Sequence, residues 1–163
     1  MKTIIKASLS VFVLLATVAC SSVKTNLERL NEVTQKINAK DYTIGVNYAN
    51  PMRGKQIYLN FDYDLRIKND SAFAYLPYYG VVSRAPYGGG KGGIKFAEPM
   101  KEYSIAPNKK NDGWDIRFKV DTPDYNYDIM MNVFNDGSSL IKVNSFQRDP
   151  ISFSGAIKGL KSE

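Results

Sequence analysis

Hydrophobic residues change their spacing at Asp41, from every third or fourth position to every second. Before that point a mostly apolar stripe recurs at helical spacing, formed by Leu27, Leu30, Val33, Thr34 and Ile37. Thr25 and Glu28 stand at the spacing of a capping box, in which each side chain satisfies a backbone amide of the first turn. The pattern predicts one amphipathic helix from Thr25 to about Ala39, with its apolar stripe packed on the rest of the domain.

From Asp41 onward apolar and polar residues alternate, as they do in antiparallel strands with one face toward a core and one toward water. The predicted inward positions fall in four runs: Tyr42, Ile44, Val46 and Tyr48; Ile57, Leu59, Phe61, Tyr63, Leu65 and Ile67; Trp114, Ile116, Phe118 and Val120; Tyr127, Ile129, Met131 and Val133. Weaker strand patterns cover 94–96 and 102–105, and a last strand is predicted at 151–153.

Turn sequences separate these runs, including Asn69-Asp70, Asn111-Asp112-Gly113 and Asn135-Asp136-Gly137. Short strands divided by such turns predict a mainly β protein. We expect an antiparallel barrel-like or sandwich sheet with one N-terminal α-helix lying against one opening or face.

The first residues form an export signal. Lys2 and Lys6 give a short cationic start, residues 8–16 are apolar, and Ala19 precedes Cys20, the only cysteine in the chain. The apolar stretch is too short for a membrane-spanning helix and fits a signal peptide. A single cysteine in an exported chain needs an explanation, and attachment of lipid supplies one.

We therefore expect residues 1–19 to be a lipoprotein signal peptide, 20–24 to be the lipidated Cys20 with a short spacer, and 25–163 to be a single β-rich domain. Several acyl chains would hold the protein stably at a membrane. Thr17 stands where strict lipoprotein signals carry Leu. The alternative is an ordinary secretory peptide that leaves Cys20 as a free thiol.

Composition narrows the possible chemistry. The formal net charge is +6, and loss of Lys2 and Lys6 with the signal leaves 20 basic against 16 acidic residues, a net +4. These charges alternate along the predicted strands, which indicates a solvated face and no nucleic-acid partner. The chain contains no histidine. That excludes Ser-His-Asp triads, Cys-His dyads and the usual zinc sites.

No other motif predicts catalysis or metal binding. Asp124, Asn126 and Asp128 begin like a calcium loop, but Ile129 replaces its required glycine and no closing glutamate follows. We predict a loop running into a strand there. The sequence thus predicts no catalytic residue, no metal site and no cofactor, with a carboxylate-pair glycosidase as the remaining enzymatic alternative.

The segment Gly88-Gly89-Gly90-Lys91-Gly92-Gly93 formally matches a dinucleotide fingerprint. The context does not fit, since no βαβ unit surrounds it and the following residues predict a strand. Five glycines in six residues predict a flexible surface loop. The functional alternative is a flap that closes over a ligand.

Tyrosines concentrate just before this loop, at Tyr75, Tyr78 and Tyr79, with Tyr87 following. Pro77 cannot donate to a strand ladder, which places the segment at a sheet edge or a bulge. Beside a barrel opening these four tyrosines would line a pocket for an apolar, amphipathic or sugar-like ligand. Alternatively they are half-buried sheet residues, or an exposed edge that pairs with another envelope protein.

Four segments resemble the domain of unknown function 4251 family: Asn50-Pro51-Met52-Arg53-Gly54, Leu65-Arg66-Ile67-Lys68-Asn69-Asp70-Ser71, Tyr75-Leu76-Pro77-Tyr78-Tyr79-Gly80 and Ala85-Pro86-Tyr87-Gly88-Gly89-Gly90. The resemblance covers about residues 25–155. It implies a small exported lipoprotein of the Bacteroidetes cell envelope, with no assigned activity and no functional residue to carry over. Residues 21–24 lack the acidic run that resembles a surface-export tag in such lipoproteins, so we expect a periplasm-facing protein.

Residues and resemblance together predict a non-catalytic binding module for a small apolar or amphipathic ligand, held at the membrane by its lipid anchor. The alternative is an interaction or scaffold lipoprotein whose partner is another envelope protein.

Overall fold

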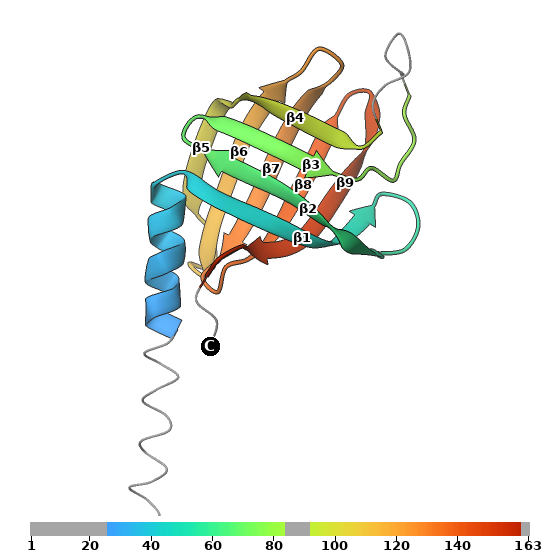
Figure 1. Cartoon of the computed structure of the whole chain (residues 1–163). Coiled ribbons are helices and arrows are strands. Elements are labelled where there is room, and N and C mark those ends of the chain that lie inside the picture. The colour runs from blue at the N-terminus through green and yellow to red at the C-terminus, as the bar shows by residue number, and fades with distance from the viewer. Residues whose placement is uncertain (1–25, 84–91, 161–163) are drawn as a thin grey trace, which may run out of the picture.

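The computed structural model describes residues 26–83 and 92–160, which form one helix and nine antiparallel strands (Figure 1). The helix covers residues 26–38 and leads directly into the first strand. The strands are β1 (Asp41–Pro51), β2 (Ile57–Lys68), β3 (Ser71–Leu76), β4 (Ile94–Pro99), β5 (Lys101–Pro107), β6 (Gly113–Asp121), β7 (Asn126–Phe134), β8 (Ser138–Ser145) and β9 (Arg148–Ile157). The prediction of a mainly β fold with one N-terminal helix is confirmed.

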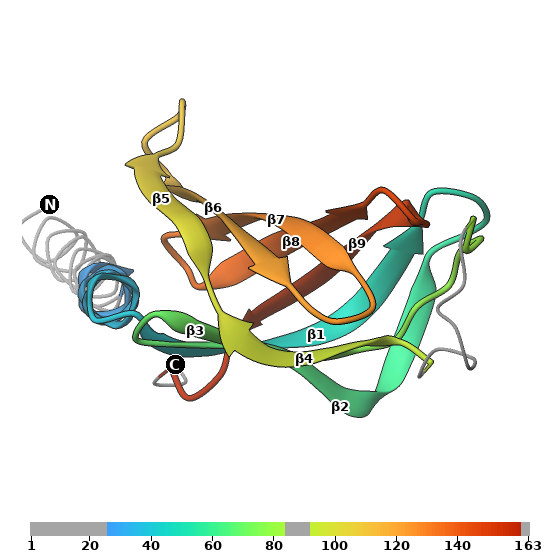
Figure 2. The ribbon, with the colours of Figure 1, turned by 90° about the horizontal axis from the view of Figure 1, so that it is seen from above.

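All nine strands belong to one sheet in the order β4-β3-β2-β1-β9-β8-β7-β6-β5. β4 and β5 stand at opposite ends of this order, yet Met100 alone separates them in the chain. β4 pairs with β3 while β5 pairs with β6, so the chain passes from one end of the sheet to the other. Seen from above, this passage and the β1–β9 pairing join two curved layers into a nearly closed barrel (Figure 2).

Side chains fill the inside of this barrel. The largest fully buried residues come from the helix and from every strand except β5: Ile37, Ile44, Leu65, Ile67, Leu76, Ile94, Ile116, Phe118, Ile129, Met131, Ile141 and Phe153. Barrels of about eight strands have interiors that side chains can just fill. The alternation predicted for β6 and β7 is confirmed, because their predicted inward residues are buried, with Trp114 partly so. The interior of the barrel is thus its hydrophobic core.

Two residues predicted to face inward lie at the surface instead. Tyr48 is 39% exposed and Phe61 is 69% exposed. The register of β1 shifts at Asn47, after which Ala49 is buried in place of Tyr48. A bulge adds one residue and reverses the inward and outward positions that follow it. Phe61 lies within residues 59–62 of β2, which have no partner on β1.

The helix packs against the end of the barrel that carries the β7–β8 turn (Figure 1). Val33 and Ile37 are fully buried, and Arg29 donates a hydrogen bond of 2.9 Å from Nε to the carbonyl of Asp136. Leu27, predicted on the same stripe, is exposed. The expectation of a helix against one opening is confirmed, with the stripe buried only toward its C-terminal half. Within the described ranges, no helix is both long and apolar enough to cross a bilayer.

Candidate functional site

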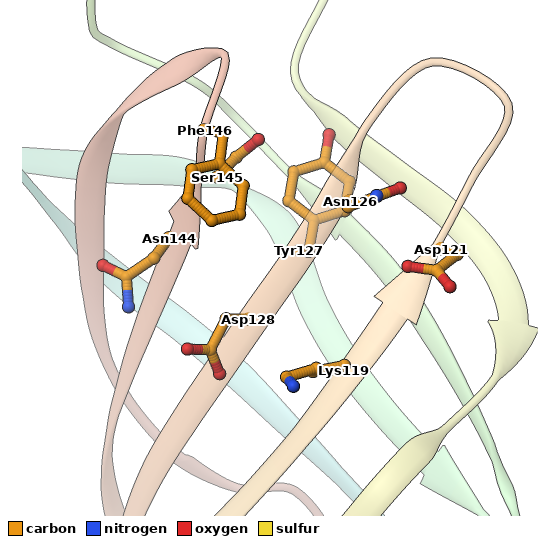
Figure 3. Close-up of a pocket in the computed structure, with 8 residues that line it drawn as sticks. All are labelled: Lys119, Asp121, Asn126, Tyr127, Asp128, Asn144, Ser145 and Phe146. Carbon is orange, nitrogen blue, oxygen red and sulfur yellow. The ribbon is translucent and has the colours of Figure 1, made fainter.

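A pocket of about 500 Å³ lies on the outer face of β6, β7 and β8 (Figure 3). The β6–β7 and β8–β9 turns beside it are at the end of the barrel away from the helix (Figure 1). It is lined by Lys119, Asp121, Asn126, Tyr127, Asp128, Asn144, Ser145 and Phe146. Most of these side chains point outward, because they occupy the polar positions of the alternating strand pattern.

Strand register explains how residues distant in sequence meet in this pocket. Asp128 on β7 pairs with Lys119 on β6 and with Asn144 on β8. Side chains at directly opposed positions lie on the same face with Cβ atoms about 4.5–5.5 Å apart. The three residues therefore form one polar row across three strands, visible in Figure 3. Asp121 and Asn126 are paired at the end of β6 and the start of β7.

Ion pairs hold the charges on the β5–β6 side of the pocket. Lys101 Nζ lies 2.7 Å from Asp121 Oδ2, and Lys119 Nζ contacts Glu102 Oε2. The hydrogen bond with Asp121 raises the pKa of Lys101, and the hydrogen bond with Glu102 raises that of Lys119. Both lysines are well exposed, so each pair contributes little to stability. Each ion pair instead offsets one charge of the pocket, that of Asp121 or that of Lys119.

Three other polar residues of the pocket lack hydrogen-bond partners in the described chain, although the charge of Asp128 acts on Lys119 and helps to raise its pKa. The side chains of Asn126, Asp128 and Asn144 make no hydrogen bond with any residue of the described chain. A carboxylate accepts hydrogen bonds, whereas an amide both donates and accepts them. The pocket therefore offers a mixed set of hydrogen-bonding groups to a ligand.

Two aromatic residues border these groups. Phe146 occupies the β8–β9 turn and is 98% exposed. Tyr127 is buried, with its ring centroid 5.5 Å from that of Phe96 and 5.9 Å from that of Tyr125. Burial raises the pKa of Tyr127 to about 12. The pocket thus has a free aromatic ring at its rim, and beside it the ring of Tyr127 is packed into the core.

Tyr75 lies on the opposite outer face of the barrel. Its ring stacks on that of Tyr63 at 5.3 Å between centroids, and Lys95 Nζ lies 4.7 Å from the same ring. It borders a second hollow of about 340 Å³ on β1, β2 and β3, together with Thr43, Asp64, Arg66, Phe73 and Ala74. β3 pairs with β2 on one side and β4 on the other, without a register shift in either pairing, so the prediction of a sheet edge or a bulge is wrong for this strand. The strand ends at Leu76, directly before Pro77.

Tyr78 belongs to a segment that runs from β3 across to β9. Its hydroxyl lies 3.0 Å from the carbonyl oxygen of Val81 and 3.1 Å from that of Asp149. Val82 forms a β-bridge with Arg148, whose guanidinium lies 4.9 Å from the ring centroid of Tyr78. Tyr78 and Tyr75 therefore have separate contacts and do not share a pocket wall. Tyr79 follows them at the surface and is partly exposed.

Of the remaining predicted residues, only Gly92 and Gly93 lie within the described chain. Cys20, Tyr87 and 88–91 lie outside it. Gly92 lies in open space, whereas Gly93 has φ +88° and would place a Cβ 2.7 Å from the carbonyl oxygen of Leu76. Gly93 is thus required by the backbone at the start of β4.

The pocket residues were not predicted as a site from the sequence. Asn126 and Asp128 were considered only as the start of a calcium loop, and Asn144 gave no local signal. Their proximity depends on strand register, which no short motif encodes. Within residues 26–83 and 92–160, no group of three or more His, Cys, Asp or Glu residues is placed to hold a metal ion.

Comparison with known proteins supplies the family. Residues 24–157 match the family described as a domain of unknown function (DUF4251). The chain belongs to the DUF4251 family. This confirms the resemblance noted in the sequence, and it extends over nearly all of the predicted domain.

A solved DUF4251 structure shows the same fold. The crystal structure of a DUF4251 family protein from Bacteroides eggerthii DSM 20697 is similar to this chain, with a TM-score of 0.62 and 12% sequence identity. The similarity covers 79% of this chain and 86% of that protein. At this identity the likeness concerns the fold alone. A search of curated proteins found no match.

Proposed function

We propose that this DUF4251 protein is a non-catalytic binding module of the cell envelope, which holds a small amphipathic ligand on the outside of its barrel. The observation that carries the proposal is the pocket on β6–β8, where polar side chains without hydrogen-bond partners in the described chain lie beside the exposed ring of Phe146. Its volume of about 500 Å³ is in the range of small-molecule sites.

The packed interior supports an external site. Phe118, Met131 and Phe153 are fully buried inside the barrel and contribute to its core. A ligand within the barrel would have to displace such side chains, at a cost of several kcal/mol for each cavity opened. A ligand on the outer face needs no such rearrangement.

The carboxylates of the pocket support binding in preference to glycoside hydrolysis. A glycosidase acid requires an environment that raises its pKa, usually burial away from water. The Asp121 side chain is 47% exposed and ion-paired with Lys101. An exposed carboxylate in an ion pair differs from the buried acid of a glycosidase, and its oxygens are placed to accept hydrogen bonds.

The proposed location rests on the sequence of the N-terminus. Cys20 follows an apolar export signal and has only a short spacer before the domain. A lipid on Cys20 would hold the barrel close to a membrane, and residues 21–24 favour the periplasmic side.

Binding is tested with the full chain extracted in detergent from its own host. Native mass spectrometry should find a bound small molecule, and thermal shift assays with lipids, bile salts and glycans should show stabilisation by one class. Asn144→Ala should abolish the shift. Lys142→Ala is the matched control, since Lys142 is exposed on the same strand but does not line the pocket. An apo mass with no shift for any class would refute the proposal.

A second candidate function is docking of another envelope protein. It is favoured by exposed aromatic residues on β1, β2 and β3: Tyr48, Tyr58, Phe61 and Tyr75. Tyr48 and Tyr58 contact each other edge to face at 5.5 Å between centroids. Clustered aromatic side chains at a surface are typical of protein contacts. A photo-crosslinker in place of Tyr58 should capture one envelope protein in cells, and recovery of none would count against this alternative.

A further inference from the structure

We infer that the ligand of the β6–β8 pocket is a neutral saccharide, with one face of a sugar ring against Phe146 and its hydroxyl groups on Asp128 and Asn144. The inference deepens the proposed function and rests on it. It follows from the combination of groups that the pocket presents.

The exposed ring of Phe146 favours a ligand with a flat face of C–H groups. Phe146 is 98% exposed at the β8–β9 turn, and its ring has no contact with another ring in the described chain. The face of an aromatic ring carries partial negative charge and attracts C–H groups, which carry partial positive charge. A sugar ring offers such a face, whereas a charged or fully polar ligand does not.

The polar part of the pocket disfavours a lipid tail. Lys119, Asp128 and Asn144 form a row of polar side chains across the floor. A purely apolar ligand would remove water from these groups and return no hydrogen bonds, which is unfavourable for each group. The ligand must therefore carry several hydrogen-bonding groups as well as an apolar face.

The spacing of the row fits neighbouring hydroxyl groups. Asp128 and Asn144 are directly paired on adjacent strands, so their side chains project from Cβ atoms about 4.5–5.5 Å apart. Asp128 can only accept, and Asn144 can both donate and accept. A pair of adjacent hydroxyl groups satisfies both residues, with one donating to Asp128 and the other accepting from Asn144. Asn126 on the next paired position adds a further amide.

The charges select a neutral ligand. Lys119 and Asp121 are already paired with Glu102 and Lys101. Asp128 has no hydrogen-bonded partner in the described chain, and Lys119, on which its charge acts, already binds Glu102. An anionic ligand would be repelled by it. Because the pocket lies on an outer face, the bound sugar can be one unit of a longer chain.

The test uses the full chain in detergent on an array of neutral, anionic and amino-sugar oligosaccharides, followed by titration with the best neutral oligosaccharide. We expect binding that Phe146→Ala and Asn144→Ala each weaken about tenfold, equivalent to one lost contact of about 1.4 kcal/mol. Phe146→Trp should retain binding because it keeps an aromatic face, and Lys142→Ala should leave it unchanged. Melting temperatures of the variants should match that of the unmodified protein, since these residues are at the surface.

Other outcomes separate this inference from the proposed function. Neutral glycan binding that survives Phe146→Ala and Asn144→Ala would place the site elsewhere and overturn the inference. Stabilisation by lipids or bile salts that is lost in the same variants would also overturn it, while the proposed function would stand. Loss of glycan binding on addition of EDTA would overturn direct recognition by these side chains, because a cation would then bridge the ligand. No binding of any class would overturn both.

Discussion

Arg148 keeps its charge almost entirely out of water, with only 8% of the residue exposed. Buried charges are usually paired with an opposite charge. Here Nη1 donates a 2.7 Å hydrogen bond to the carbonyl of Gly93, and the guanidinium lies 3.7 Å from the ring centroid of Tyr125. Nε has no partner among the described residues. The planar guanidinium stacked on tyrosine rings ties β9 to the β6–β7 turn and to the start of β4.

Replacing Arg148 with lysine tests whether planarity matters. Lysine keeps the charge but is a point charge that cannot stack on Tyr78 and Tyr125. We expect Arg148→Lys to lower the unfolding free energy by about 2–3 kcal/mol, measured by urea denaturation. Arg117→Lys at an exposed position of β6 is the control and should change little. Equal stability of Arg148→Lys and the unmodified protein would contradict the stacking role.

Buried tyrosines predict loss of stability at alkaline pH. Burial raises the pKa of Tyr127 to about 12 and raises that of Tyr42 as well. Tyrosines of the unfolded chain ionise near pH 10. Below that pH both states keep their protons and stability is unaffected. Above it the unfolded state releases protons that the folded state retains, so stability falls as pH rises from about 10 to about 12.

Tyr127→Phe should make this fall shallower by up to about 1.4 kcal/mol for each pH unit above 10. The measurement is urea unfolding at several values between about pH 9 and about pH 11. Tyr58→Phe, at an exposed ring, serves as the control and should follow the unmodified protein. Identical pH dependence in Tyr127→Phe would show that burial of this hydroxyl has no energetic effect.

At the scale of strands, alternation and turn residues predicted much of the fold. The turn at Asn69-Asp70 is confirmed, because Lys68 pairs with Ser71 across it. The turn ending at Gly137 is also confirmed, with φ +82° at that glycine, which side chains disfavour. These signals are local, since they depend on the backbone freedom and burial of single residues.

The sequence pattern did not predict which strands pair or in which register. The bulge at Asn47 adds one polar residue and leaves no compositional trace, yet it moves Tyr48 to the surface. Closure through β4 and β5 depends on which strands meet, and alternation does not encode this. The pocket has the same origin, because Asp128 and Asn144 meet only through register. The predicted tyrosines were found from composition, which does not distinguish the two faces of a strand.

Close contact between β1 and β9 leaves no room for a side chain at Gly155. A Cβ on Gly155 would clash with the carbonyl oxygen of Gly45, which is backbone and cannot move without separating the two strands. We expect Gly155→Ala to lower the unfolding free energy by about 3 kcal/mol or more, measured by urea denaturation. Gly92→Ala is the control, since it meets open space and should stay within about 0.5 kcal/mol. Equal stability of the two variants would rule out this close contact.

For the whole molecule, the helix and the pocket lie at different ends of the barrel. The helix packs beside the β7–β8 turn, whereas the β6–β7 and β8–β9 turns lie at the other end of the barrel (Figure 1). The pocket is lined by residues next to these two turns. The proposed lipid attachment at Cys20 precedes the helix by only a few residues, which span roughly 20 Å if fully extended. An anchor at that end would leave the pocket facing away from the membrane, accessible to soluble ligands.

This arrangement depends on lipid at Cys20, which labelling with an alkyne fatty acid tests directly. The unmodified protein should carry the label, and Cys20→Ala should not, because the thiol that accepts the first lipid is gone. The uncleaved apolar segment at residues 8–16 should keep part of the variant at the inner membrane, so labelling decides the question and fractionation alone does not. Protease added to intact cells should leave the protein untouched and should digest it after lysis. An unlabelled native protein would make Cys20 a free thiol and the protein a secreted one, and digestion in intact cells would place the pocket on the cell surface.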